Sequence, residues 1–554
     1  MNLRLLSQPS KRTTRNTTHP LPCIQPFCPA IAPCLRPEPD FIGSTRSGFQ
    51  IQGPVSDKFA RIERIPELRR LLTIPLFLLA LAFGTQAHAY SLLTHEQLID
   101  LTWKDSIVPL LLSRYPNLTP AQLEQARAYA YGGCVIQDIG YYPFGDVSYS
   151  NLTHYVRSGD FVVNLFRNAT NADELAFAVG ALSHYIGDSV GHSSAVNLAV
   201  GVEFPKLRAK YGPEVNYAEG EHQHVQTEFA FDINEIAHHR LAPVHYLRHI
   251  GLQVPLKQLA LAFYQTYGLQ EDFTGKRGRR INVTDYRFAV RAFIPRIAYA
   301  VTLLHRSHEP ADPDTPDARE IQAESAQVAT ENDWQAYRRK AGIGTYALAG
   351  LLFVLPKVGP LKLVAVKGPT QATEADYLHS VVLSTAALRR ALAGFTPPAS
   401  SNTASAASAA AAVPAQVAQA QALPVHPVSE PLHPATQGPS QSPVGIQSPD
   451  PRHPLPNRDL DTGRVIQPSG YSLTDETYAR LLHLLTRQPT LPIPPGIKED
   501  IQAYYADLTL PFATKKNPTQ WAQVQADLAT LVAMPTSVRP DPYPTYGASW
   551  DSTN

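Results

Sequence analysis

Hydrophobic and polar positions in the middle of the chain follow the repeat of α-helices. One helix begins at Thr119, which suits an N-cap, and Pro120, which suits the first turn; good helix formers fill residues 121–130. Residues 173–182 are rich in alanine and leucine and predict another helix. We therefore expect an all-α fold built as a multi-helix bundle.

The C-terminal part regains helical spacing after a long interruption. Residues 396–468 are rich in Ala, Pro, Ser and Gln, with few aromatics. Such a segment cannot bury enough apolar area to offset its ordering entropy, so it is expected to be a disordered linker. Beyond it Tyr478, Leu481 and Leu485 recur at helical spacing, and a second helix follows a cap at Asn517. These patterns predict a small helical C-terminal module.

A strongly apolar stretch, residues 341–355, ends at Pro356. At about 15 residues it is short of the roughly 20 that span a bilayer. We expect a buried helix here. The alternative is peripheral membrane contact, which a phospholipid substrate would favour.

The residues before Tyr90 have the pattern of a signal peptide. A short basic region precedes the apolar residues 71–83, and an Ala-His-Ala cleavage site ends at residue 89. Cleavage would make Tyr90 the N-terminus of a secreted or periplasmic protein. Of four cysteines only Cys134 lies beyond this point, which excludes an internal disulfide in the mature chain.

Residues with zinc-binding side chains follow Tyr90 in an ordered series. His184, Asp188 and His192 are four residues apart and would share one helix face, and the later His and Glu pair repeats this spacing. One such pair is common without metal, and Glu235 with His239 is a rival. Facing helices that each carry a pair can build a metal site in a bundle core. The full series is Tyr90, through its α-amino group, with His95, Asp138, His154, His184, Asp188, His192, His224 and Glu228.

This series resembles that of the zinc-dependent phospholipases C, which have single-strand-specific zinc nucleases as close structural relatives. The resemblance covers about residues 90–305. It implies an all-α domain that binds up to three Zn²⁺ ions. One ion would be held by Asp138, His154, His184 and Asp188, and the family pattern also assigns Asp138 a general-base role.

The resemblance implies two further zinc sites. The α-amino and carbonyl groups of Tyr90 would hold a second ion with His95, and Asp188 would bridge it to the first. The third ion would be held by the set His192, His224 and Glu228.

Three departures from the family pattern concern these sites. The mature chain would start with Tyr90 in place of the usual Trp, which backbone ligation tolerates. Only three residues separate Asp188 from His192, where the family more often has five. The Tyr90–His95 gap is more similar to the nucleases, whereas the ending with Glu228 is more similar to the phospholipases, so the substrate class stays open.

The expected organisation has six parts. In order they are a disordered or mis-assigned leader (1–68), a signal peptide (69–89), a zinc-dependent phospholipase C-like domain (90–310), a helical extension with the apolar segment (311–395), an Ala/Pro-rich linker (396–468) and the C-terminal module (469–554).

The predicted function is hydrolysis of phospholipid headgroups by attack of a zinc-activated water on phosphorus. The first alternative is a zinc-dependent single-strand nuclease or nucleotidase, and the second is a non-catalytic, metal-stabilised binding protein. A formal net charge of +1 gives no basic field for duplex nucleic acid. Four aromatics near the proposed base are candidates for a choline-binding wall or for ordinary core packing: Tyr141, Tyr142, Phe144 and Tyr149.

Overall fold

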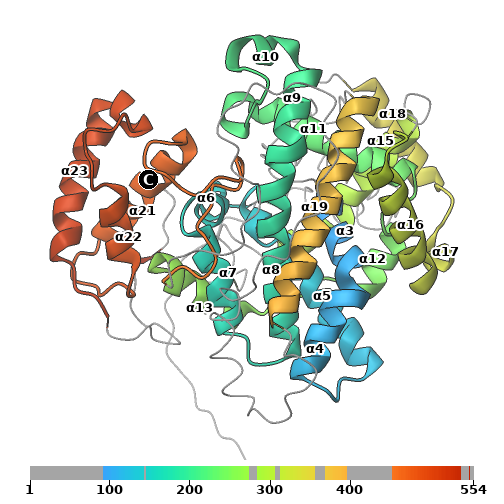
Figure 1. Cartoon of the computed structure of the whole chain (residues 1–554), viewed down its shortest axis with the longest axis horizontal. Coiled ribbons are helices and arrows are strands. Elements are labelled where there is room, and N and C mark those ends of the chain that lie inside the picture. Colours follow the sequence, from blue (N-terminus) through green and yellow to red (C-terminus); the bar gives the residue numbers. More distant parts are fainter. Residues whose placement is uncertain are drawn as a thin grey trace, which may run out of the picture. The chain divides into compact units, whose positions relative to one another are not determined.

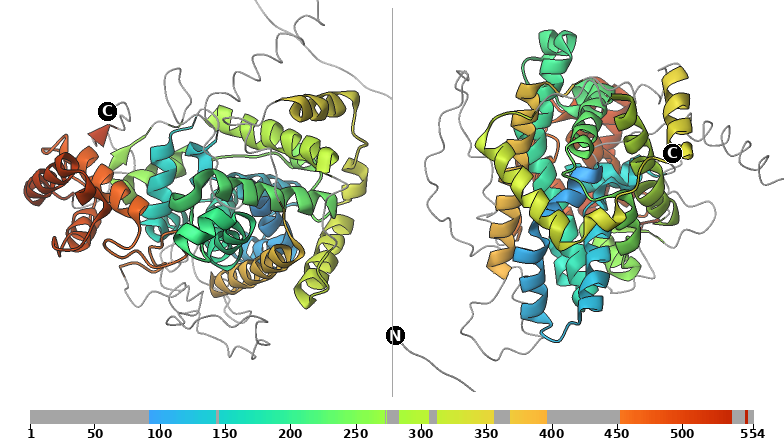
Figure 2. Two further views of the ribbon diagram at one scale, coloured as in Figure 1. Left: turned by 90° about the horizontal axis from the view of Figure 1, so that it is seen from above. Right: turned by 90° about the vertical axis from the view of Figure 1, so that its right-hand side faces the viewer.

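The computed structural model describes residues 92–142, 145–271, 273, 283–305, 312–355, 368–395, 452–537 and 548–549. These residues fall in one compact unit of the chain, Arg70–Asn554. The leader, the signal peptide and Tyr90 lie outside the described residues. Figures 1 and 2 show helices throughout this part of the chain.

The expected all-α class is confirmed. Within the described ranges, strands are confined to the short parallel pair β1 (Leu269–Gln270) and β2 (Ala548–Ser549). Among the described helices, none has the length and apolar character that a bilayer-spanning segment requires.

The family-like part of the chain is a succession of α-helices with short 3₁₀ and π segments. The α-helices are α3 (Leu92–Thr102), α4 (Val108–Arg114), α5 (Pro120–Gly133), α6 (Val147–Tyr155), α7 (Ser158–Arg167), α8 (Ala172–Gly191), α9 (Asn197–Glu203), α10 (Pro205–Tyr211), α11 (Tyr217–Ala237), α12 (Val244–Ile250), α13 (Leu256–Tyr267), α14 (Val283–Phe288) and α15 (Ile294–His305). The short segments are η2 (Trp103–Ile107), η3 (Gln137–Gly140), η4 (His192–Val196) and η5 (Ala289–Phe293).

The later helices form an extension and the C-terminal module. The extension comprises α16 (Pro316–Glu331), α17 (Trp334–Tyr337), α18 (Ile343–Val354) and α19 (Gln371–Phe395). The module comprises α21 (Ser472–Thr486), α22 (Ile497–Tyr504), η7 (Ala513–Lys516) and α23 (Pro518–Ala533).

Local sequence signals account for several of the helix starts. Thr119 caps α5 in a reciprocal capping box with Gln122, as its sequence predicts. Asn171 accepts a hydrogen bond from the Glu174 N–H and caps α8. Asn517 caps α23 and Pro518 fills its first position.

Helix α8 is the centre of the domain and packs against α5, α7 and α19, with α19 running alongside it in Figure 1. Glycines allow its close approach to α5. A Cβ atom at Gly180 would lie 2.2 Å from the Ala130 carbonyl oxygen, and one at Gly133 would lie 2.1 Å from that of Phe177. Close contact on several sides buries α8 from Leu175 to its end and places its polar side chains in the interior.

The C-terminal module packs on the family-like part. Tyr478 of α21 stacks on Tyr504 of α22 with ring centroids 3.7 Å apart, and α21 packs against α6. The packed segment begins inside the stretch that composition assigns to the linker, because Leu455 and Leu460 are buried. These two apolar residues stand in a Pro-rich context and form no periodic pattern, so composition does not reveal the packing.

Helix α18 is not the buried helix that its apolar composition predicts. Ala349 and Leu352 pack in a small cluster with side chains of α11 and α15. The opposite face is open, with Ile343 90% and Phe353 74% exposed. The sequence shows no polar stripe here, so the exposed face of α18 is itself apolar.

Candidate metal centre

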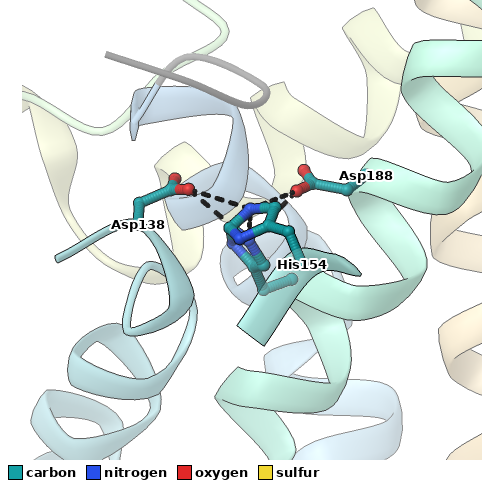
Figure 3. Close-up of side chains that lie close together, drawn as sticks. Asp138, His154 and Asp188 are labelled. Atoms are coloured by element: carbon teal, nitrogen blue, oxygen red, sulfur yellow. Dashed lines mark hydrogen bonds and ion pairs between the residues drawn. The ribbon is translucent and has the colours of Figure 1, made fainter. Parts of the chain in front are cut away.

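Four side chains from three separate elements converge in the interior. Asp138 comes from η3, His154 from the last turn of α6, and His184 with Asp188 from α8. Each offers one ligand atom, and these atoms all lie within 4.8 Å of one another. Figure 3 shows Asp138 and Asp188 directed toward the His154 ring from either side.

The spacing of these atoms suits a shared cation. His154 Nε2 lies 3.2 Å from Asp138 Oδ1 and 3.3 Å from Asp188 Oδ2. His184 Nε2 lies 3.0 Å from Asp188 Oδ2 and 3.3 Å from His154 Nε2. Ligands at roughly 2.0–2.2 Å from one zinc ion stand about this far apart in a tetrahedron.

A second group gathers His192, His224 and Glu228, again with all ligand atoms within 4.8 Å. Glu228 Oε1 lies 2.9 Å from His224 Nε2, one turn apart on α11, and 3.3 Å from His192 Nε2. His192 opens the π segment η4, where α8 changes pitch. The short spacing from Asp188 still brings His192 to this group.

His95 of α3 joins the first group. Its Nε2 lies 3.2 Å from Asp188 Oδ1, and its ring stacks on that of His184 with centroids 4.3 Å apart. Asp232 of α11 accepts hydrogen bonds from the N–H groups of Leu93 and Thr94 and so fixes the start of α3. Tyr90, the remaining predicted ligand, lies outside the described residues.

Three of the histidines are oriented by backbone carbonyls. The Nδ1 atoms of His154, His184 and His192 lie 2.7, 3.0 and 2.9 Å from the carbonyl oxygens of Ser150, Cys134 and Leu460. A carbonyl can only accept, so Nδ1 carries a proton, and in the neutral ring Nε2 then keeps the lone pair. This tautomer is the one that presents Nε2 to a metal.

Buried polar atoms without hydrogen-bond partners indicate that these residues can bind a cation. Both carboxylate oxygens of Asp138 and of Asp188, and both ring nitrogens of His224, are buried without a hydrogen-bond partner. Such atoms are costly unless a metal coordinates them. Nitrogen and carboxylate donors in sets of three and four are the ligands that zinc prefers.

The electrostatics of the first group lead to the same conclusion. Burial raises the pKa of Asp138 to about 6, although the His184 and His154 imidazoles oppose the shift. Burial lowers the pKa of His154, but Asp138 and Asp188 outweigh it and raise that pKa to about 10. The cluster thus attracts positive charge, which a divalent ion supplies more fully than a proton does.

The other sequence candidates lie apart from the centre. Glu235 Oε1 accepts from Arg240 Nε at 2.8 Å, and His239 Nδ1 lies 3.0 Å from Arg338 Nη1, so this rival pair does not meet. Of the four aromatics, Tyr141, Tyr142 and Tyr149 are buried core residues, although the Tyr141 ring contacts His154 at 5.3 Å. Phe144 lies outside the described residues.

A third group that sequence reasoning missed consists of Asp160, His453 and Asp500. Arg157 Nε lies 2.9 Å from a carboxylate oxygen of each aspartate, and His453 bridges the two at 2.9 and 3.3 Å. Arg157 and the protonated His453 together balance the charge of the two carboxylates. We interpret this group as an ion-pair cluster that joins α7 to the C-terminal module.

The fold and the two donor groups define an all-α protein with a buried centre suited to zinc. Residues 94–272 match the family model described as zinc dependent phospholipase C, which confirms the resemblance seen in the sequence and indicates a phospholipase C-like hydrolase. No curated protein and no solved structure matches the chain.

Asp188 contacts three of the imidazoles, so its loss should affect more than one metal. We expect Asp188→Asn to lower the zinc content of the purified protein by one ion or more per chain. Asp160→Asn is the matched control, since Asp160 is a buried aspartate paired with arginine. Equal zinc content in both variants, measured by atomic emission, would contradict the assignment.

The His453 cluster gives a pH dependence of stability. Its hydrogen bonds to Asp160 and then Asp500 raise the pKa of His453 from 6.5 to about 10. The stabilisation is therefore complete below pH of about 6.5 and lost as pH rises through about 10. We expect His453→Gln to cost about 2 kcal/mol near neutral pH. Chemical unfolding should show wild type and variant converging above that range; a constant difference would exclude protonated His453 as the cause.

Proposed function

We propose that the protein is a zinc-dependent phosphodiesterase that releases phosphorylated headgroups from phospholipids. The observation that carries this proposal is the pair of buried donor groups inside the stretch that matches the phospholipase C family. We further propose that signal-peptide cleavage before Tyr90 exports the protein, so that the new α-amino group joins His95 as a metal ligand.

Each of the two donor groups would bind its own zinc ion. Asp138, His154, His184 and Asp188 would hold one ion, while a separate ion would lie at the second group. Bound zinc acts as a Lewis acid toward phosphoryl oxygen and lowers the pKa of water to about 7. Buried surroundings strengthen these charge interactions, because competing water is excluded.

Asp138 is the proposed general base. Its two carboxylate oxygens are free of hydrogen bonds, so one of them can accept a proton from the attacking water. The water oxygen forms a bond to phosphorus as the bond to the diacylglycerol oxygen breaks. The departing oxygen takes up a proton, which Asp138 would return.

The exposed face of α18 supports a peripheral membrane contact. Residues 343–355 contain no charged side chain, and Ile343, Tyr346 and Phe353 are exposed along one side of the helix. Arg339 and Lys340, also exposed, immediately precede it and complement lipid phosphates. An apolar face edged by cations suits a phospholipid surface, where the proposed substrate lies.

The activity test is release of phosphocholine from phosphatidylcholine vesicles by zinc-loaded protein that begins at Tyr90. His184→Ala should lower the rate at least about 100-fold, because it removes a metal ligand outright. His379→Ala, a partly exposed histidine outside both donor groups, should leave the rate unchanged.

The alternatives give different results in the same preparation. Digestion of single-stranded DNA without phosphocholine release would favour the nuclease. Neither activity in a folded, zinc-bearing protein would favour a structural metal site.

Membrane contact through α18 is tested by sedimentation with vesicles that contain anionic lipid. Ile343→Asp places a charge at the first position of the helix, which tolerates aspartate, yet removes an apolar contact. We expect vesicle binding to fall at least about tenfold. Val532→Asp, at a valine of the C-terminal module that is 60% exposed, is the control. Equal binding by both variants would exclude α18 as the contact.

A further inference from the structure

One zinc-type ligand is oriented from outside the family-like part of the chain. His154 and His184 donate from Nδ1 to Ser150 and Cys134, which belong to that part. His192 instead lies with Nδ1 2.9 Å from the carbonyl oxygen of Leu460, 268 residues further along the chain. The family match ends at residue 272, so this contact is an addition to the matched domain.

We name residues 459–463 the strap and describe how it is held. Leu460 N–H donates to the His154 carbonyl at 3.2 Å, so the strap touches elements of both donor groups. Asn197 Nδ2 donates to the Asp461 carbonyl at 2.8 Å. Both Leu460 and Asp461 are buried.

The Asp461 side chain is the main anchor of the strap. Its Oδ2 accepts a hydrogen bond of 2.9 Å from the hydroxyl of Tyr155, which follows His154 in the sequence. It accepts another of 2.6 Å from the hydroxyl of Tyr471, at the start of α21. Tyr471 also accepts a hydrogen bond from the Ala218 N–H, on the helix that carries His224. One carboxylate therefore links α6, the strap and the C-terminal module.

The backbone of the strap is shaped for this place. Gly463 has φ +67°, and a Cβ atom there would lie 2.1 Å from the Ser189 carbonyl oxygen, between Asp188 and His192. Asp459 Oδ1 accepts from the Asp461 N–H at 3.0 Å and closes the turn. A larger residue at position 463 would displace the strap from η4.

We propose that the C-terminal module completes the metal centre: the strap orients His192 and thereby sets the affinity of the site formed by His192, His224 and Glu228. The Leu460 carbonyl holds the proton on Nδ1 and points Nε2 at Glu228. Without the strap, the imidazole loses its acceptor and is free to rotate or to change tautomer. The site of Asp138, His154, His184 and Asp188 keeps its own orienting carbonyls.

The proposal deepens the proposed function, since it assigns the module a role at the same centre, yet it rests only on metal binding. Asp461 is a positioning residue in this scheme. It acts through Leu460 and His192: its Oδ1 lies 3.8 Å from Nδ1 of His192, whereas the ligand nitrogen Nε2 faces Glu228.

The test measures metal binding by Asp461→Ala, Asp461→Asn and a control, each in the chain that begins at Tyr90. Tyr504→Phe is the control, because Tyr504 donates to a buried aspartate inside the module, Asp475, away from the strap. Zinc content is followed during titration with a chelator. Co²⁺ absorption of the reloaded protein reports ligand geometry.

We expect Asp461→Ala to weaken one metal per chain about 10- to 100-fold, as loss of an orienting contact does elsewhere, and to leave the metal held by Asp138, His154, His184 and Asp188 in place. The Co²⁺ spectrum should change with it. Asp461→Asn, which keeps an acceptor oxygen for both tyrosines, should restore most of the affinity, and Tyr504→Phe should match wild type.

Retention of every metal at wild-type affinity by folded Asp461→Ala would overturn the proposal, as would equal weakening of all metals. If Asp461→Ala fails to fold, Tyr471→Phe replaces it, with an expected loss of a few fold at the same single site. Wild-type affinity at that site in Tyr471→Phe would likewise overturn the proposal. Zinc binding without phosphocholine release contradicts the proposed substrate alone.

Discussion

The structure depends on how it compensates buried carboxylates and imidazoles, which are costly to remove from water. The Asp138 and Asp188 oxygens lie fully buried without hydrogen bonds, a state that costs several kcal/mol for each charge that stays uncompensated. Neighbouring imidazoles compensate them only in part, because a neutral ring that donates from Nδ1 offers these oxygens only a lone pair at Nε2. A coordinated cation would resolve the conflict, and the donor sets of this interior suit one.

Helical spacing explains which parts of the site can be predicted from the sequence. His184 with Asp188, and His224 with Glu228, stand one helical turn apart, so spacing alone places each pair on one face. Asp138 and His154 carry no such local signal, because they lie in a 3₁₀ turn and at a helix end. Their place came from order along the chain and resemblance to a family. Helix starts such as Thr119 were predictable because caps act within one turn.

Contacts between segments that are distant in the sequence cannot be predicted from the periodicity of hydrophobic residues. The acceptor for His192 is a backbone carbonyl, which every residue possesses, and composition marks its surroundings as a linker. The prediction that α18 is buried was wrong for a different reason. Its sequence is apolar on all sides, and such a pattern does not indicate which side a neighbouring helix covers. In both cases tertiary context decides what local sequence leaves open.

Two parts of the chain contribute to the candidate metal centre. The side chains of both donor groups lie in the stretch that matches the family model, whereas the carbonyl that orients His192 lies beyond it. Orienting contacts act on affinity through the tautomer and rotation of a ring, so they can be supplied by any segment with a free carbonyl. A C-terminal addition could therefore come to influence the centre without altering a single ligand. The pairs Arg157–Asp500 and His453–Asp160 fasten that addition at a second place.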